Sequence, residues 1–232
     1  INSGAFEDFT RIGALAREHD AWLHIDGAFG LWARASPEKD YLTRDVDLAD
    51  SWSVDGHKWM QIPYDSGFAI VRDPDAHCRA MDISASYLNT ADDDGRNPTH
   101  FGPELSRRAR GFAAWAVFQS LGRTGVGAMV ERHCQFARAL ADRIALVPGL
   151  RVLNEVMLNK VIIGTDGDTP SDEIASLSAR LNGRGDIFVR PTISKGTKVL
   201  RVSVVSPLTT EVEIDRLAHA IRDSFRFTAL RQ

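Results

Sequence analysis

The order of helical and strand-like patterns constrains the fold of this chain more than any other feature of its sequence. Residues 5–19 carry apolar side chains at the spacing of one helix face, namely Phe9, Ile12, Leu15 and Ala16. Three short apolar runs follow, at residues 22–25, 49–59 and 66–74, and polar or turn residues end each of them. Helices that alternate with short buried strands predict an α/β fold, with a functional site along one edge of the sheet.

The second half of the sequence predicts a smaller layer of strands and helices. A long helical region extends from Glu104 to Ala145, and we expect a break at the glycine-containing stretch 122–127. Thr210 and Glu213 stand at the spacing of a capping box at the start of the last helix. A domain boundary is expected near residue 125. The further elements are strands at 149–156, 160–165, 187–192 and 198–205, and helices at 171–185 and 209–225.

Composition restricts the class of protein. The 232 residues are 44% hydrophobic and 25% charged, as in soluble globular proteins. A net charge of -3 argues against binding to nucleic acid or to an anionic membrane, and no apolar run is long enough to span a bilayer. Two cysteines, Cys78 and Cys134, without CxxC spacing argue against a disulfide framework and a zinc site. We therefore expect a cytoplasmic protein without bound metal.

Two charged residues, Asp26 and Lys58, stand where predicted strands end, which is where α/β sheets present catalytic groups. Lys58 follows His57, and Trp52 and Trp59 lie on either side of this pair in the sequence. We expect apolar surroundings for the lysine, because such surroundings favour a neutral amine over an ammonium ion. A structural salt bridge between the carboxylate and the lysine is the simpler alternative.

Four segments of the sequence resemble the group II decarboxylases that depend on pyridoxal 5'-phosphate (PLP). This family includes aromatic amino acid and glutamate decarboxylases. The segments are WLHIDGAFG at 22–30, DGHKWMQIPYDSG at 55–67, PELSRRARGFAAWAVFQSLGRTG at 103–125 and LRVSVVSPLTTEVEIDRL at 200–217. They stand in family order, and the resemblance covers nearly all of the chain, whereas the His-Lys pair alone would be a weak signal.

The resemblance implies the PLP-dependent transferase-like fold of type I. Residues 1–125 would form the C-terminal part of the large cofactor-binding domain, and residues 126–232 would form the C-terminal small α+β domain. The family carries its phosphate-binding loop and its ring-stacking residue further upstream. We therefore expect an upstream N-terminal half, and a homodimer with the active site at the interface. The chain could equally be a fragment, a cleaved product or a truncated sequence.

The resemblance also implies a role for each matching residue beside the cofactor. Lys58 would form a Schiff base with the aldehyde of PLP, and Asp26 would keep the pyridine nitrogen protonated. Ala28 would lie against the ring, and His57 would contact the phosphate or the substrate carboxylate. The implied reaction is the decarboxylation of an L-amino acid. Ordinary packing would also explain Ala28, and a backbone hydrogen bond would also explain His57.

The sequence departs from the family pattern at one point, the group that would protonate the substrate after carbon dioxide leaves. Plain aromatic amino acid decarboxylases of the family carry a tyrosine on a loop before the arginine-rich helix, but residues 89–104 contain none. His100 lies in this stretch and is the candidate acid, although a solvated loop histidine explains it as well. Relatives without the tyrosine can yield an aldehyde. A PLP-dependent aldehyde synthase, a carbon–carbon lyase and a non-catalytic fragment that needs its upstream half therefore stay as alternatives.

Two arginines are candidates for holding the substrate. Arg110 belongs to the arginine-rich start of the long helix, which the family pattern places near the active site and the dimer contact. Arg201 alternates with buried strand residues, and related aminotransferases use an arginine from this part of the small domain to bind the substrate carboxylate. A guanidinium group suits that task because it can form two parallel hydrogen bonds. Structural ion pairs would also explain both arginines.

Overall fold

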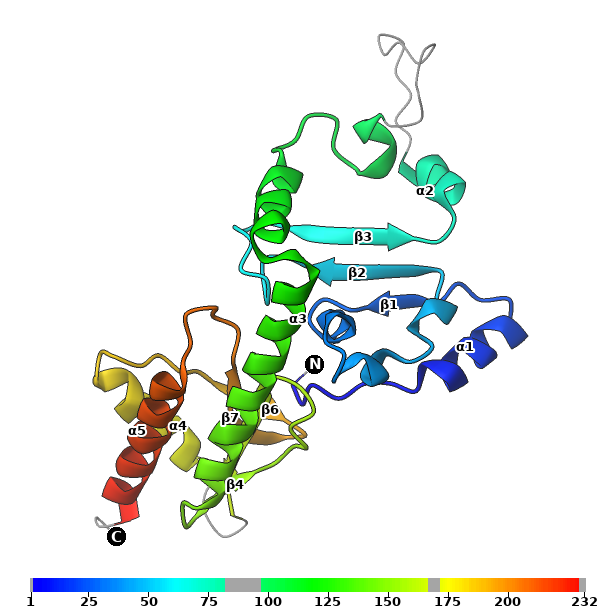
Figure 1. Ribbon diagram of the computed structural model, residues 1–232. Coiled ribbons are helices and arrows are strands. Elements are labelled where there is room, and N and C mark those ends of the chain that lie inside the picture. The colour runs from blue at the N-terminus through cyan, green and yellow to red at the C-terminus, as the bar shows by residue number, and fades with distance from the viewer. Residues whose placement is uncertain (1, 82–96, 167–171, 230–232) are drawn as a thin grey trace. The chain divides into compact units, whose positions relative to one another are not determined.

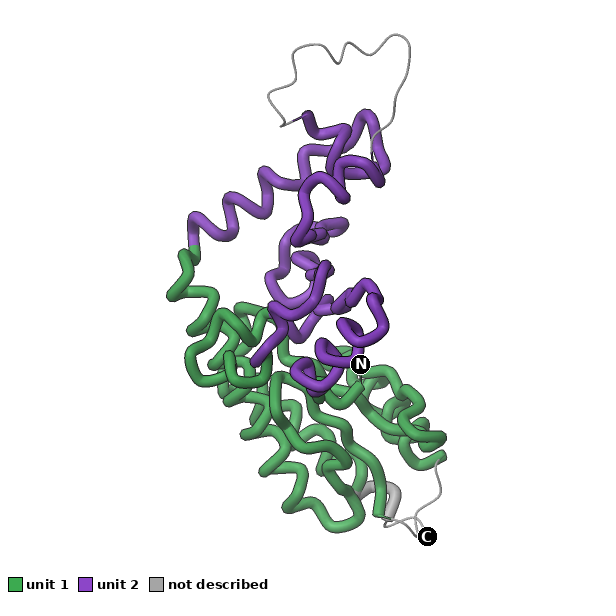
Figure 2. The backbone as a smooth tube through the Cα atoms, turned by 90° about the vertical axis from the view of Figure 1, so that its right-hand side faces the viewer, with its two compact units in different colours: residues 1–7, 32–43, 121–232 green, residues 8–31, 44–120 purple. Residues whose placement is uncertain are grey.

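The computed structural model describes residues 2–81, 97–166 and 172–229, and within them the chain forms two compact units (Figure 2). Unit 1 contains residues 1–7, 32–43 and 121–232, and unit 2 contains residues 8–31 and 44–120. Helices and strands are present in both units, so the α/β class is confirmed. The domain division at residues 125 and 126 stays a prediction.

Unit 2 holds a three-stranded sheet in the order β1-β2-β3 (Figure 1). Strand β1 (His24–Asp26) is parallel to β2 (Ser51–Asp55), and β2 is antiparallel to β3 (Gly67–Val71). Ile25 of β1 forms a small core with Val46, Ala49 and partly buried apolar neighbours. The other elements of unit 2 are helices α1 (Phe9–Glu18) and α2 (Pro74–Met81), the 3-10 helices η3 (Val46–Leu48) and η4 (Pro98–Phe101), and the start of α3 (Arg110–Ala145).

Several predicted boundaries in unit 2 were wrong. The first helix begins at Phe9 because the side chain of Asp8 caps it by accepting a hydrogen bond from the Arg11 N–H at 3.1 Å. Trp22 lies outside β1 and is 57% exposed, so it is not part of a buried strand. The long helix begins at Arg110 instead of Glu104.

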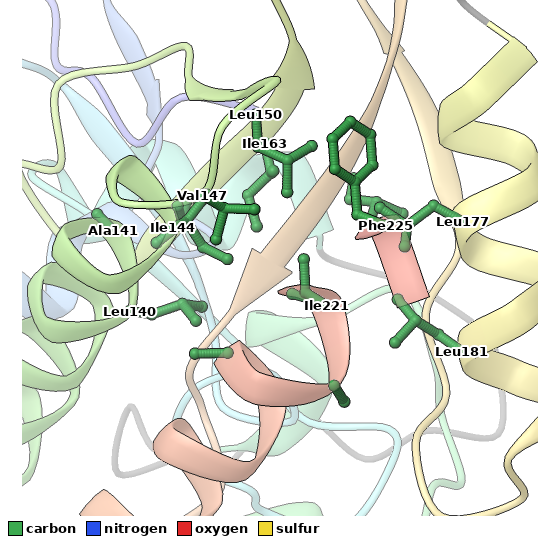
Figure 3. Packing of buried hydrophobic residues seen from close by; sticks show 14 of the residues in the cluster. Leu140, Ala141, Ile144, Val147, Leu150, Ile163, Leu177, Leu181, Ile221 and Phe225 are labelled. Carbon is green, nitrogen blue, oxygen red and sulfur yellow. The ribbon is translucent and has the colours of Figure 1, made fainter. Parts of the chain in front are cut away.

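Unit 1 holds a four-stranded antiparallel sheet in the order β4-β5-β7-β6. The elements are β4 (Leu150–Val152), β5 (Lys160–Thr165), α4 (Asp172–Gly183), β6 (Pro191–Ser194), β7 (Thr197–Ser203), α5 (Glu211–Ala229) and the 3-10 helices η1 (Gly30–Ala35, which begins in unit 2) and η2 (Asp40–Thr43). The core of unit 1 includes Leu140 and Ile144 of α3, Ile163 of β5, Leu177 of α4 and Ile221 of α5 (Figure 3).

Two local predictions about helices are confirmed. Helix α3 changes direction at Gly122, whose φ of 60° and ψ of 176° are not helical. The predicted capping box also forms, because the Glu213 carboxylate accepts hydrogen bonds from the Thr210 backbone N–H at 2.8 Å and from its hydroxyl at 2.6 Å. Among the described residues, none of the helices is both long and apolar enough to cross a bilayer.

Candidate active site

The candidate site lies at the carboxyl edge of the parallel strands β1 and β2 in unit 2. Asp26 is the last residue of β1 and pairs in register with Ser53 of β2. Asp55 ends β2, and His57 and Lys58 follow it directly. Since parallel strands present their carboxyl ends at one edge, Asp26, His57 and Lys58 share that edge, as expected from the sequence.

Ala28 connects the two strand ends through its backbone. Its N–H donates a hydrogen bond to Oδ1 of Asp26 at 3.1 Å, and its carbonyl oxygen accepts one from the N–H of Asp55 at 3.1 Å. The turn before Ala28 is tight, because a Cβ on Gly27 would lie 2.7 Å from Cβ of Leu31 and 3.1 Å from the carbonyl oxygen of Ser53. Glycine therefore allows the close approach that places Ala28 between the strands.

Lys58 forms an ion pair with the carboxylate of Asp55, three residues earlier in the chain. The side chain of Lys58 is 45% exposed, whereas that of Asp55 is 22% exposed. The prediction of apolar surroundings for Lys58 is therefore wrong. The neighbouring Trp59 is fully buried, and its ring lies 5.2 Å from that of Phe29, so this aromatic side chain packs into the unit.

Asp55 is the residue of this site that the sequence did not single out. The signal that could have found it is the Asp-x-x-Lys spacing at the end of an apolar run, since a turn after the strand brings the two charges together. The same carboxylate oxygen, Oδ2, also lies 3.7 Å from Nε2 of His57. One carboxylate therefore stands beside both residues of the His-Lys pair.

His57 is anchored by the backbone of Ser66. Its Nδ1 accepts a hydrogen bond from the backbone N–H of Ser66 at 3.1 Å and also lies 2.6 Å from the carbonyl oxygen of the same residue. The ring of Tyr64 lies 4.5 Å from the His57 ring. His57 thus makes the expected backbone contact and still directs Nε2 toward the carboxylate of Asp55.

Arg110 forms ion pairs with two carboxylates in unit 2. Its Nε lies 3.1 Å from Oδ1 of Asp65, and its Nη1 lies 3.0 Å from Oε2 of Glu104. The hydrogen bond from Arg110 lowers the pKa of Asp65, and the same contact raises the pKa of Arg110. Arg108 donates a hydrogen bond to the carbonyl oxygen of Tyr64 at 3.1 Å. These contacts attach the loop after Lys58 to the start of α3.

The other two predicted site residues lie on different elements. His100 is half-buried in η4, and its backbone N–H donates a hydrogen bond to the carbonyl oxygen of Asn97 at 3.0 Å. Much of the stretch 89–104 lies in residues 82–96, outside the described residues. Arg201 belongs to β7 of unit 1, where its Nη1 donates to Oδ1 of Asn2 at 3.0 Å. It lines a hollow of about 680 Å³ together with Arg190 and Arg216.

Comparison with known proteins identifies the family. Residues 1–163 match the pyridoxal-dependent decarboxylase conserved domain. The chain belongs to the pyridoxal-dependent decarboxylase family. It is 29% identical to the aromatic-L-amino-acid decarboxylase of Drosophila melanogaster over 216 residues, which are 92% of this chain and 42% of the fly protein. The chain thus spans about half the length of the curated relatives it matches, from 42% to 53% of the first three.

Solved structures share the fold of the family, fold type I. The crystal structure of Oryza sativa TDC with PLP and tryptamine matches with a TM-score of 0.88 and 24% identity, over 98% of this chain and 49% of the rice chain. Rhodiola rosea 4-hydroxyphenylacetaldehyde synthase matches with a TM-score of 0.81 and 24% identity, over 95% of this chain and 46% of that one. The fold class expected from the sequence is confirmed.

The side chains at the carboxyl edge of β1 and β2 fit the cofactor of this family. PLP carries an aldehyde, a ring nitrogen that can be protonated and a phosphate. The edge supplies an exposed amine on Lys58, an exposed carboxylate on Asp26 and an imidazole on His57. Between them stands Ala28, whose side chain is a single methyl group.

Proposed function

We propose that this chain provides the cofactor lysine and the pyridine-facing carboxylate of a PLP-dependent amino acid decarboxylase. One observation carries the proposal: Asp26 ends β1, and Lys58 follows the end of the adjacent parallel strand β2. The backbone of Ala28 bonds to both strand ends and fixes the spacing between them. A shared strand edge is where α/β proteins bind their ligands.

Each residue of the edge has a task in this reaction. PLP, when bound, accepts the electron pair that remains after the bond to the carboxylate breaks. Asp26 would hold a proton on the ring nitrogen through its negative charge, and Lys58 would bind the cofactor aldehyde through its amine. Ala28 would face the ring. His57 would contact the phosphate or the substrate carboxylate, and His100 would deliver the proton to the α-carbon.

The whole active protein would include more than this chain. We propose that an upstream N-terminal half supplies the phosphate-binding loop and the ring-stacking residue, and that two copies form a homodimer. The lengths of the relatives support a longer active protein, because the chain spans only 42% of the fly enzyme. Arg110 and Arg201 remain our candidates for binding the substrate carboxylate, although Arg110 already has two carboxylate partners.

A second reaction of the same cofactor is favoured by one observation. The stretch 89–104 contains no tyrosine, the residue that the plain aromatic amino acid decarboxylases use as the acid. Without an acid at the α-carbon, oxygen could react there instead. One molecule of O2 and one of water would be consumed, and the products would be an aldehyde, ammonia and hydrogen peroxide, in addition to carbon dioxide.

Product analysis tests both reactions. The longest polypeptide that contains this chain would be incubated with PLP and a panel of L-amino acids, and carbon dioxide, amine, aldehyde and peroxide would be measured. Amine formation that is lost in Lys58→Ala and retained in Lys195→Ala, a change in the β6–β7 turn, is the expected result. Aldehyde with peroxide would favour the synthase. Decarboxylation that persists in Lys58→Ala would contradict both.

A further inference from the structure

The carboxylate of Asp55 is held in place more firmly than an ordinary surface charge. Its backbone N–H donates to the carbonyl oxygen of Ala28 at 3.1 Å, and the residue pairs with Gly67 of β3. Its side chain is 22% exposed. For comparison, Asp172 pairs with Lys198 at 2.7 Å and is 83% exposed, although the two lysines are nearly equally exposed, at 45% for Lys58 and 44% for Lys198.

We propose that Asp55 is a positioning residue for Lys58. Its carboxylate holds the lysine in an ion pair at the carboxyl end of β2, and this contact limits how fast the amine reacts with aldehydes. The inference deepens the proposed function, because it concerns the lysine that is assigned there to the cofactor. Asp55 acts through Lys58 and His57, both of which approach its Oδ2 atom.

The physical reason is the ion pair itself. The amine nitrogen of Lys58 must leave the carboxylate before it can attack the carbon of an aldehyde, so removal of the negative charge removes this barrier. Exposed ion pairs are weak, and breaking one changes such a rate by up to about fivefold. Because Asp55 is more shielded than Asp172, we expect an effect near the top of this range.

Reductive methylation tests the proposal without any cofactor. The chain would be treated with formaldehyde and cyanoborohydride, and the rate of methylation at each lysine would be followed by peptide mass spectrometry. Asp55→Asn should raise the rate at Lys58 by about three- to fivefold. Asp55→Glu, which keeps the charge, should leave that rate within about twofold of the unchanged chain.

The pair in unit 1 supplies the matched control. Asp172→Asn should raise the rate at Lys198 and leave the rate at Lys58 unchanged, because the two pairs belong to different units. An unchanged Lys58 rate in Asp55→Asn would overturn the proposal. A rise shared equally by Lys58, Lys195 and Lys198 in that variant would also overturn it, since a general loosening of the fold would then explain the effect.

Salt provides a second measurement on the unaltered chain, which does not depend on the folding of a variant. Raising the ionic strength from about 0.01 to about 1 M shortens the Debye length from about 30 to about 3 Å and weakens ion pairs. Methylation of Lys58 should become faster relative to Lys195, and a constant ratio would contradict the proposal. If Asp55 passes these tests while Lys58 does not react with PLP, the proposed function fails and the role of Asp55 stands.

Discussion

The backbone N–H of Asp55 donates a hydrogen bond to the carbonyl oxygen of Ala28 at 3.1 Å, and this bond joins the two strand ends of the candidate site. Ala28 also donates to the carboxylate of Asp26, so a short chain of contacts leads from Asp26 to the ion pair of Asp55 with Lys58. The charged groups are thus carried by backbone bonds at the edge of a sheet. Such support is what a precise site requires.

The charge of Asp26 should matter more than its shape. Asn at this position keeps an oxygen that can accept the bond from Ala28, so we expect Asp26→Asn to fold and to lose only the charge. The loss of a preorganised electrostatic partner costs about 10²–10³-fold in kcat. Steady-state kinetics of the amino acid reaction would measure this, with Asp75→Asn on α2 as the control. Equal kcat values for the two variants would refute the role of Asp26.

The turn before Ala28 should not tolerate a side chain. In Gly27→Ala the new Cβ would lie 2.7 Å from Cβ of Leu31, which forces a shift of the turn. We expect the free energy of unfolding to fall by about 1–3 kcal/mol. Urea unfolding would measure the change. Gly183→Ala at the end of α4 is the control, because no atom lies within 4 Å of a Cβ there.

The stability of unit 1 should depend on pH through His133. This side chain is fully buried, and burial, followed by the charge of Arg132, lowers its pKa from 6.5 to about 4. Between these two values the unfolded chain binds a proton that the folded chain does not bind, so stability falls as the pH falls. From pH 7.5 to pH 5.5 we expect a loss of about 1 kcal/mol from this residue.

The measurement is urea unfolding of the unaltered chain and of His133→Gln at both pH values. His133→Gln cannot take up a proton, so its stability should change less over this interval. Asp65, Asp172, Asp186 and Glu213 have lowered pKa values and stay ionised at pH 5.5, so they add little to the slope. An identical pH dependence in both proteins would show that His133 does not titrate as described.

The capping box of α5 should contribute to stability through the side chain of Thr210. Thr210→Ala removes a single hydroxyl with two contacts. This hydroxyl donates to the Glu213 carboxylate at 2.6 Å and accepts from the Val212 N–H at 3.3 Å. We expect a loss of about 1 kcal/mol in the free energy of unfolding. Thr210→Ser keeps the hydroxyl and should lose much less in the same urea titration. Equal losses would assign the effect to packing.

The meeting of Asp26 and Lys58 at one sheet edge could be predicted from the sequence, because it follows from where the strands end. Asp26 and Lys58 each follow an apolar run, and parallel pairing brings such ends to one edge. The surroundings of Lys58 could not be predicted in the same way. Aromatic neighbours in sequence are not neighbours in space after a strand ends, and Trp59 turns inward while Lys58 faces solvent.

Helix α2 shows a different reason for failure. Asp73 and Pro74 end the third apolar run of the sequence, and β3 does end before them, at Val71. The sequence did not predict the helix that begins there: Asp73 accepts a hydrogen bond from the Ala76 N–H at 3.0 Å and caps α2 at Pro74. Aspartate followed by proline is also a helix start, so the same two residues fit both structures. The apolar face of the following residues was too short to decide between them.

The central claim is that Lys58 is the lysine that binds the cofactor. The most direct measurement is to incubate the longest polypeptide that contains this chain with PLP, reduce it with borohydride and map the modified peptide by mass spectrometry. We predict stoichiometric labelling at Lys58 that is lost in Lys58→Ala and retained in Lys195→Ala. Labelling scattered over surface lysines, or absent from Lys58, would contradict the account.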